Sequence, residues 1–319
     1  MRLKTKHLSL LVLAVAILVA PLFFPSGFYY RIGGLVFING IAVTGMVILI
    51  GYAGQISLGH AGFAGIGAYS CALAPVHLGI PPVAAIGLGA VLSAMLAWVV
   101  GRPILKLHGY YLGVATLGLG SLITIILSNE IQWTGGPDGI AVPDLGLRGL
   151  LRSYGLRIGS GELWYWLAAA VMMVGAWLAL NLFESSTGRA LRALHTSEVA
   201  ARTMGVNVPR YKLHAFVISA VYASVSGSLL ALMNRLITPD VAGFMHSVQM
   251  VTMAVLGGVS SVVGAILGAT ILTALPQLLT VFQQYEHMIL GLVMILVMIF
   301  MPQGLLSTLL KRFRAGDDT

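Results

Sequence analysis

The segment Gly51–Tyr69, GYAGQISLGHAGFAGIGAY, places six glycines and several hydrogen-bonding side chains within an apolar part of the chain. VTGMVILI precedes it and SCALAPV follows it, so Gln55, Ser57 and His60 have hydrocarbon-rich sequence on both sides. Polar groups at membrane depth need partners, and irregular backbone is tolerated there only against protein or a water-filled cavity. We therefore predict a helix break at Tyr52–His60, packed against protein or beside a water-filled cavity.

Composition assigns the chain to the membrane proteins. Of the 319 residues, 58% are hydrophobic and 9% are charged, and the mean hydropathy is +0.94. Soluble domains carry roughly 25% charged residues. The sequence therefore predicts an all-α, polytopic membrane protein, because helices satisfy their own backbone groups in lipid. The net charge of +8 fits basic loops at a membrane surface, so we expect no nucleic-acid partner.

Apolar segments predict about ten transmembrane helices in a single domain covering residues 1–319. The first follows a basic start, MRLKTKH, which is also typical of a signal peptide. We expect this helix to be retained and not cleaved, because Pro21 directly follows the small-residue site Val19-Ala20 and disfavours cleavage there. His246–Leu256 is short, and it is either a half-helix or part of a bent span. The segments are Leu8–Phe24, Ile32–Ile50, Leu58–Leu78, Val83–Val100, Leu107–Leu127, Leu163–Leu182, Leu213–Met233, His246–Leu256, Val262–Val281 and His287–Met301.

The distribution of Lys and Arg predicts the orientation. Basic residues gather at both termini, after the fourth span and in the 184–212 loop, and ten spans place all four regions on one side. Cytoplasmic loops carry the excess of Lys and Arg. We therefore expect both termini in the cytoplasm and the 129–162 loop on the outer side of the membrane.

Two glycine-rich motifs suggest internal repetition. GYAGQISLGHAG lies in the first half and LGGVSSVVGAILGA in the second, about five spans later. An odd offset makes corresponding helices point in opposite directions, which is the arrangement of an inverted repeat. Chance similarity between glycine-rich membrane helices is the alternative.

The same glycines suggest close helix packing. Gly51 and Gly62, like Gly54 and Gly65, are eleven residues apart, which is about three turns of a continuous helix. Small residues on one face let membrane helices approach to backbone contact. We therefore predict packing as the main role of the glycines and hydration of the break as the role of the polar groups.

The chain lacks the features of an autonomous energy source. Every Asp, Glu, Lys and Arg falls outside the predicted spans or at their ends, whereas proton-driven devices usually carry ionisable groups within the membrane. None of the five lysines has the preceding glycine of a phosphate-binding loop. A pump of this sequence would take its energy from another chain. A sodium site built from carbonyl groups stays open, and with it a self-sufficient secondary transporter or channel.

Catalysis and metal binding are not indicated. Ser57 and His60 are three residues apart, but a Ser–His nucleophile needs an orienting carboxylate, and the nearest acidic residue in the sequence is Glu130. The eight histidines are scattered without a His/Cys cluster. We expect a protein that is not an enzyme and binds no cofactor of its own.

The 184–212 loop, ESSTGRALRALHTSEVAARTMGVNVPRYK, predicts two short helices. Ser186 or Thr187 can cap the first and Ser197 the second, which would end at Gly205 before Pro209 stops any continuation. Exposed alanines would let another protein approach closely. A helix lying on lipid headgroups, held by Arg189, Arg192 and Arg202, is the alternative.

Several motifs in order resemble one transporter family. GRALRALHTSEVAARTMGV resembles the glutamate–alanine–alanine coupling motif of bacterial ATP-binding-cassette importers, although a valine separates Glu198 from Ala200. GYAGQISLGHAGFAGIGAY looks like the signature of their branched-chain amino-acid permease subunit, the LivM type. TGGPDGI at Thr134–Ile140 and VLGGVSSVVGAILGA at Val255–Ala269 fit the same family.

The resemblance implies an ABC importer permease fold in the bacterial inner membrane, with the 129–162 loop in the periplasm, and a set of partners. A second permease would complete the pore, two cytoplasmic ATP-binding subunits would use ATP, and a periplasmic binding protein would deliver leucine, isoleucine or valine. Relatives also transport urea, short amides and other small acids, and these ligands stay open. The path residues would be Tyr52, Gln55, Ser57, Gly59 and His60, and the coupling residues Gly188, Arg189, Arg192, Glu198, Ala200, Ala201 and Gly205.

Overall fold

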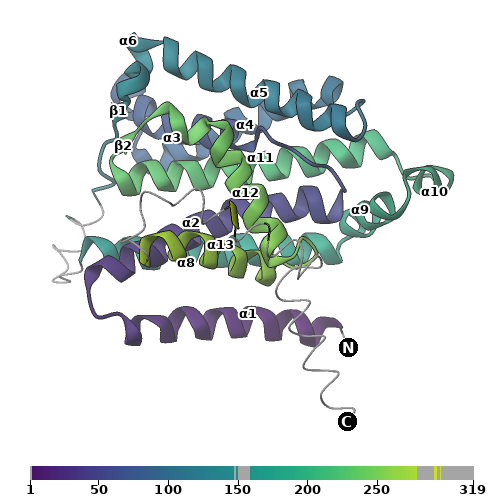
Figure 1. The fold of residues 1–319 in the computed structure, drawn as a ribbon, viewed down its shortest axis with the longest axis horizontal. Coiled ribbons are helices and arrows are strands. Elements are labelled where there is room, and N and C mark those ends of the chain that lie inside the picture. The colour runs from purple at the N-terminus through teal and green to yellow at the C-terminus, as the bar shows by residue number, and fades with distance from the viewer. Residues whose placement is uncertain (1, 147–148, 150–158, 279–290, 293–294, 296–319) are drawn as a thin grey trace.

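A computed structural model describes residues 2–146, 149, 159–278, 291–292 and 295 of the chain. Its helices lie mostly side by side in one bundle (Figure 1). The long helices are α1 (Arg2–Val19), α2 (Gly27–Met46), α3 (His60–Leu78), α4 (Pro82–Ile104), α5 (Tyr110–Asn129), α8 (Ser160–Glu184), α11 (Val208–Asn234), α12 (Phe244–Gly257) and α13 (Val262–Leu278). The short elements are α6 (Ile131–Thr134), α9 (Ser186–Thr196), α10 (Glu198–Thr203), β1 (Ile140–Ala141) and β2 (Leu236–Ile237).

The predicted apolar segments match the observed helices closely. Within the described residues, six helices are long and apolar enough to cross a membrane: α2 with its extension to Tyr52, α3, α4, α5, α8 and α11. Three shorter apolar helices in the same part of the chain coincide with the first, eighth and ninth predicted segments. The tenth predicted segment, His287–Met301, lies almost entirely outside the described residues.

Local sequence explains several helix boundaries. Pro82 occupies the first turn of α4, where a missing N–H group costs nothing. The Glu162 carboxylate accepts a hydrogen bond from the backbone N–H of Gly159, which caps α8. The Asn207 side chain accepts one from the backbone N–H of Arg210 at the start of α11.

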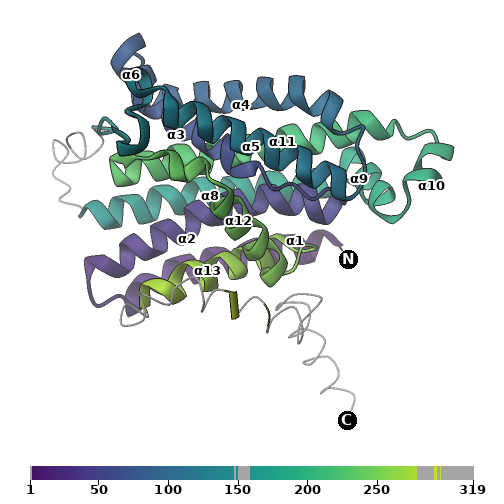
Figure 2. The same cartoon turned by 45° about the horizontal axis from the view of Figure 1, so that its top comes forward.

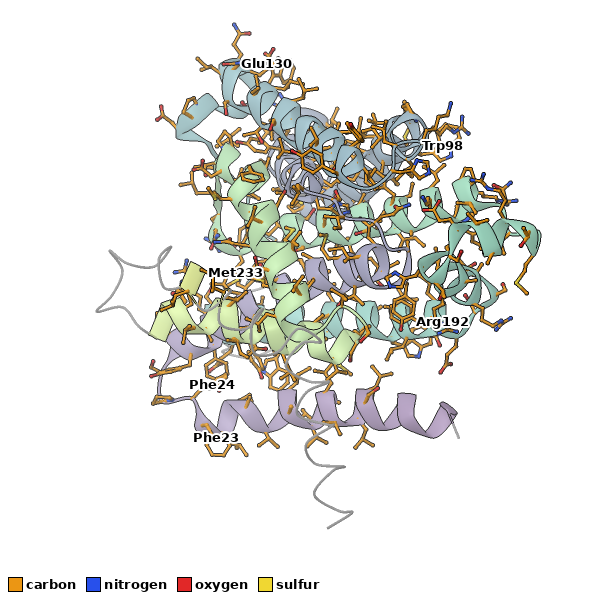
Figure 3. The ribbon with its side chains drawn as sticks, turned by 45° about the vertical axis from the view of Figure 1, so that its right-hand side comes forward. Phe23, Phe24, Trp98, Glu130, Arg192 and Met233 are labelled. Atoms are coloured by element: carbon orange, nitrogen blue, oxygen red, sulfur yellow. The ribbon has the colours of Figure 1, made fainter. Side chains whose placement is uncertain are left out.

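The bundle has two distinct ends, which Figure 3 separates clearly. Trp98 and Arg192 lie toward one end, with α9 and α10, and we call this the α9–α10 end. Phe24 and Met233 lie toward the other, the strand end, where β1 pairs antiparallel with β2. There an ion pair of 2.6 Å between Arg235 and Asp144 adds a second link between the segment after α6 and the end of α11.

Helices α2 and α11 form the centre of the bundle and run in opposite directions. α2 packs on α8 and α13, while α11 packs on α3 and α4. Glycines allow the closest of these contacts: a methyl group at Gly67 would overlap the carbonyl of Ser224, and one at Gly227 the carbonyl of Ala64. Backbone-to-backbone packing of this kind is how membrane helices associate without a hydrophobic driving force.

Two of the helices begin inside the bundle instead of at its ends. α3 follows residues 53–59, and α12 follows residues 235–243. Their first turns meet, because the Ser247 hydroxyl accepts a hydrogen bond of 3.0 Å from the backbone N–H of Ala61. From this point α3 runs to the strand end and α12 toward the α9–α10 end, and α12 is inclined to the other helices (Figures 1 and 2).

The two halves of the chain therefore share one pattern in opposite directions. Each half contains a central helix, then an irregular segment, then a helix that starts inside the bundle, and last a helix packed beside that one. In the first half these are α2, residues 53–59, α3 and α4. In the second half they are α11, residues 235–243, α12 and α13. In the second half, Gly257 and Gly264 bring α12 and α13 into backbone contact. The inverted repeat itself stays a prediction.

Candidate functional site

The break after α2 is present in the structure at the predicted place. The helix widens to a π-helix over Val47–Tyr52, and the chain is not helical from Ala53 to Gly59. Gly54 has φ +66°, a conformation that suits glycine, and it starts the turn back into the bundle. The hydrogen bond from the Leu58 N–H to the Thr116 hydroxyl, 3.1 Å long, fixes the returning chain against α5.

Three polar side chains of this break are buried. Gln55, Ser57 and His60 are each 2% exposed or less. The Ser57 hydroxyl lies 2.7 Å from Nδ1 of His60, so these two side chains satisfy one another. Both amide atoms of Gln55 and Nε2 of His60 have no hydrogen-bond partner among the described residues. A buried polar group without a partner costs about 1–3 kcal/mol, so these atoms mark a place built for something other than packing.

His60 stands at the meeting point of three helices. Its ring is edge-on to Phe63 of α3 and Phe216 of α11, each with centroids 5.6 Å away. One turn further along α11, the Ser219 hydroxyl also lacks a partner in the described part of the chain. The first turns of α3 and α12 meet here through the Ala61 N–H and the Ser247 hydroxyl, and helix N-termini favour negative charge. No local sequence pattern pointed to Ser219 and Ser247 as members of this site.

The glycines of the Gly51–Tyr69 segment make close packing contacts, as predicted, but each of them contacts a different part of the chain. A methyl group at Gly51 would overlap the Val259 carbonyl, and one at Gly59 the Thr116 carbonyl. Gly65 packs against Ala242. Because the break separates Gly51 from Gly62, the shared face expected for a continuous helix does not exist.

The 184–212 loop folds into the two predicted short helices, α9 and α10. Ser185 caps α9 by accepting from the Gly188 N–H, so the prediction of Ser186 or Thr187 as the cap is wrong by one or two residues. Ser197 caps α10 as predicted. Gly205 has φ +81° and turns the chain after α10. Pro209 does not end α10, which stops six residues earlier; it lies in the first turn of α11.

The exposed surface of α10 differs from the one predicted. Ala201 and Gly188 are buried within the chain, and only Ala200 of the two motif alanines is exposed. The largest exposed apolar side chains are Val199, 76% exposed, and Met204, 83% exposed. Arg189 and Arg192 are exposed on α9. Val199 and Met204 were not predicted as exposed contact residues, because Val199 was considered only as a departure from the glutamate–alanine–alanine coupling motif.

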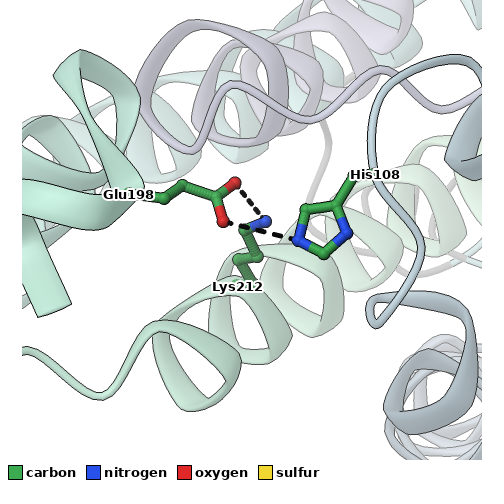
Figure 4. A network of polar contacts seen from close by, with 3 residues as sticks. All are labelled: His108, Glu198 and Lys212. Atoms are coloured by element: carbon green, nitrogen blue, oxygen red, sulfur yellow. Dashed lines mark ion pairs between the residues drawn. The ribbon is translucent and has the colours of Figure 1, made fainter.

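Glu198 joins α10 to two neighbouring elements. Its carboxylate forms an ion pair with Lys212, which is buried near the start of α11, and lies 3.7 Å from Nε2 of His108 (Figure 4). A buried ammonium needs such a partner to offset the loss of its hydration. Glu198 therefore fixes α10 on the base of α11 and is not freely available to another protein.

The loop and the break are in direct contact. The Arg192 guanidinium interacts electrostatically with the Tyr52 side chain, and His195 packs against Gly54. Tyr52 also stacks on Phe183, in the last turn of α8. The structure thus brings both predicted groups of site residues into one connected region. Within the described residues, no group of three His, Cys, Asp or Glu side chains could hold a metal ion.

Comparison with known proteins reveals one family and two kinds of relative. The profile of a family described as "Branched-chain amino acid transport system / permease component" matches residues 29–298. The "High-affinity branched-chain amino acid transport system permease protein LivM" of Escherichia coli (strain K12) is 34% identical over 316 residues, 93% of this chain and 73% of that protein. LivH of the same organism, a permease protein of the same description, is 29% identical over 287 residues, 84% and 90% of the two chains.

A third relative shows how far the chain extends over these proteins. LivM of Salmonella typhimurium is 34% identical over 280 residues, which are 82% of this chain and 66% of that protein. The chain therefore spans about two thirds to three quarters of the LivM relatives it matches. No solved structure is significantly similar to it.

Proposed function

The chain belongs to the branched-chain amino acid transport system permease family, and from this premise we propose that it is one of two permeases in an ATP-driven importer. The similarity to both LivM and LivH of one organism supports pairing with a second, related permease. Two ATP-binding subunits would supply the energy, and a binding protein would deliver and select the branched-chain amino acid. The single observation that carries the proposal is the family match over residues 29–298.

The proposed orientation places the α9–α10 end in the cytoplasm and the strand end in the periplasm of a bacterial inner membrane. The placement of Lys and Arg supports it, since the 184–212 loop has five basic residues against two acidic ones. The 129–162 loop, with β1 and Asp144, would then face the binding protein.

The proposed path for the substrate runs beside the break, along Tyr52, Gln55, Ser57, Gly59 and His60. A branched-chain amino acid at neutral pH carries a carboxylate, an ammonium group and an apolar side chain. The first turns of α3 and α12 meet at this site, and the positive ends of their helix dipoles would favour the carboxylate, as discontinuous helices do in other transporters. The Gln55 amide can accept from the ammonium group, and Phe63 and Phe216 border the site with apolar surface.

The proposed coupling element is α9 with α10. Val199 and Met204 would enter a cleft of an ATP-binding subunit, with Ala200 allowing close approach and Arg189 and Arg192 at the side. Closure of the ATP-binding subunits would move α10 as a rigid body. The contacts of Arg192 with Tyr52 and of His195 with Gly54 would carry that movement to the break.

Reconstitution in proteoliposomes tests the proposal. The chain, the second permease and both ATP-binding subunits should take up radiolabelled leucine when the binding protein is outside and ATP is inside. Met204→Glu with Val199→Glu should abolish uptake and lower ATP hydrolysis while the permease stays folded. Thr203→Glu, at an exposed position whose hydroxyl bonds only to its own helix, is the matched control. Uptake by this chain without ATP-binding subunits would identify a secondary transporter or channel instead.

A further inference from the structure

A pocket of about 780 Å³ opens at the α9–α10 end, between the last turn of α4, the segment after it, α10 and the first turns of α11. Five of the residues that line it are cationic: Arg102, Lys106, Arg202, Arg210 and Lys212. Glu198 is the only acidic lining residue, and it is already paired with Lys212. The lining thus carries an excess of positive charge, which selects an anionic ligand.

The surroundings of the pocket point to a ligand with an apolar part. The Arg102 guanidinium lies 3.6 Å from the ring centroid of Trp98, which is half exposed on the same face of α4. Val91 and Met95 continue this exposed apolar face from Trp98 toward the strand end. Trp at a membrane–water interface sits at headgroup level, and cations beside it attract anionic headgroups.

We propose that this pocket binds the phosphodiester headgroup of an anionic phospholipid, whose acyl chains lie along α4. Arg102 and Arg210 approach the phosphate from α4 and α11, and Trp98 marks the depth of the glycerol region. A free phosphate would use the same cations but not the apolar face of α4. The pocket also contains Glu198 and Arg202 of α10, so the lipid braces the element that carries Val199 and Met204.

Native mass spectrometry of the full-length chain, with added phosphatidylglycerol or phosphatidylcholine, tests the proposal. We expect one phosphatidylglycerol to stay bound under activation that removes phosphatidylcholine. Arg102→Gln with Arg210→Gln should weaken this binding on the order of tenfold or more, since each cation near an anionic surface contributes measurably. Arg189→Gln, which removes an exposed charge of α9 outside the pocket, should leave binding at the wild-type level.

The melting temperature of each variant in phosphatidylcholine checks that it is folded. Equal retention of phosphatidylglycerol by the pocket variant and the wild type would overturn the proposal. So would an equal rise in melting temperature with inorganic phosphate or glycerol 3-phosphate alone, because that result identifies a site for a soluble anion. A rise that requires the acyl chains supports the lipid.

Discussion

The rings of Tyr52 and Phe183 stack with their centroids 3.6 Å apart and their planes inclined by 3°. Tyr52 ends the π-helix that precedes the break, and Phe183 lies in the last turn of α8, directly before α9. The stack therefore connects the proposed path to the proposed coupling element by side-chain packing, next to the contact between Arg192 and Tyr52.

The first prediction concerns this stack. Phe183→Leu keeps an apolar side chain but removes the flat contact, and we expect uptake to fall several-fold while ATP hydrolysis continues. Movement of α9 would then be transmitted poorly to the break. Phe28→Leu, an exposed aromatic residue at the strand end, serves as the control. Equal uptake by the two variants would show that the stack only stabilises the fold.

The second prediction concerns the polar groups of the break. His60→Leu and Gln55→Leu retain bulk and remove hydrogen bonding, so uptake should fall while assembly with the ATP-binding subunits persists. Ser70→Ala is the control, because the Ser70 hydroxyl bonds only to its own helix at Ile66. Wild-type uptake by both leucine variants would remove these side chains from the path and leave a packing role alone.

The third prediction concerns Glu198 and Lys212. Glu198→Gln leaves the buried Lys212 ammonium with a weaker partner. We expect the free energy of unfolding to fall by about 1–3 kcal/mol. This loss is smaller than that for a fully buried ion pair, because Glu198 is partly exposed. Glu198→Gln combined with Lys212→Met should recover most of the loss in thermal unfolding experiments. Glu198→Arg would place two cations together, so it disrupts α10 itself instead of testing docking.

The fourth prediction concerns the glycine contacts between α3 and α11. Gly227→Ala places a methyl group against the backbone of Ala64, and we expect destabilisation of about 1–3 kcal/mol or failure to fold, as for overpacked cores. Gly87→Ala and Gly118→Ala meet no atom within 4 Å and should leave the melting temperature unchanged or slightly higher. A similar melting temperature for all three variants would contradict close packing at this interface.

The fifth prediction concerns orientation. A cysteine at position 138, beside β1, should react with a membrane-impermeant maleimide added outside intact cells. A cysteine at position 192 on α9 should react only after the membrane is opened. Cys71 is buried and provides an unreactive background. The reverse pattern of labelling would place the α9–α10 end outside and remove the proposed coupling role.

Hydropathy and charge predicted much of the fold, because each membrane-spanning helix can be identified from the apolar composition of its own segment. Gln55, Ser57 and His60 likewise revealed the break, since polar groups there need an exceptional environment. The pairing of Glu198 with Lys212 depends on how α10 folds back onto the next helix, α11. The inclusion of Ser219 and Ser247 in the site depends on contacts between elements far apart in the sequence, which local sequence does not encode. The cap at Ser185 was missed because three neighbouring residues could each supply a hydroxyl.

The interlocking of the two halves has a consequence for synthesis of the protein. α3 is completed long before α11, yet His60 and Gly67 of α3 pack against Phe216 and Ser224 of α11. About 150 residues separate His60 from Phe216, so the ribosome needs roughly 8–30 s to supply the partner at 5–20 residues per second. During that time the polar break must be sheltered, and we expect newly made chains to dwell at the insertion machinery until α11 emerges.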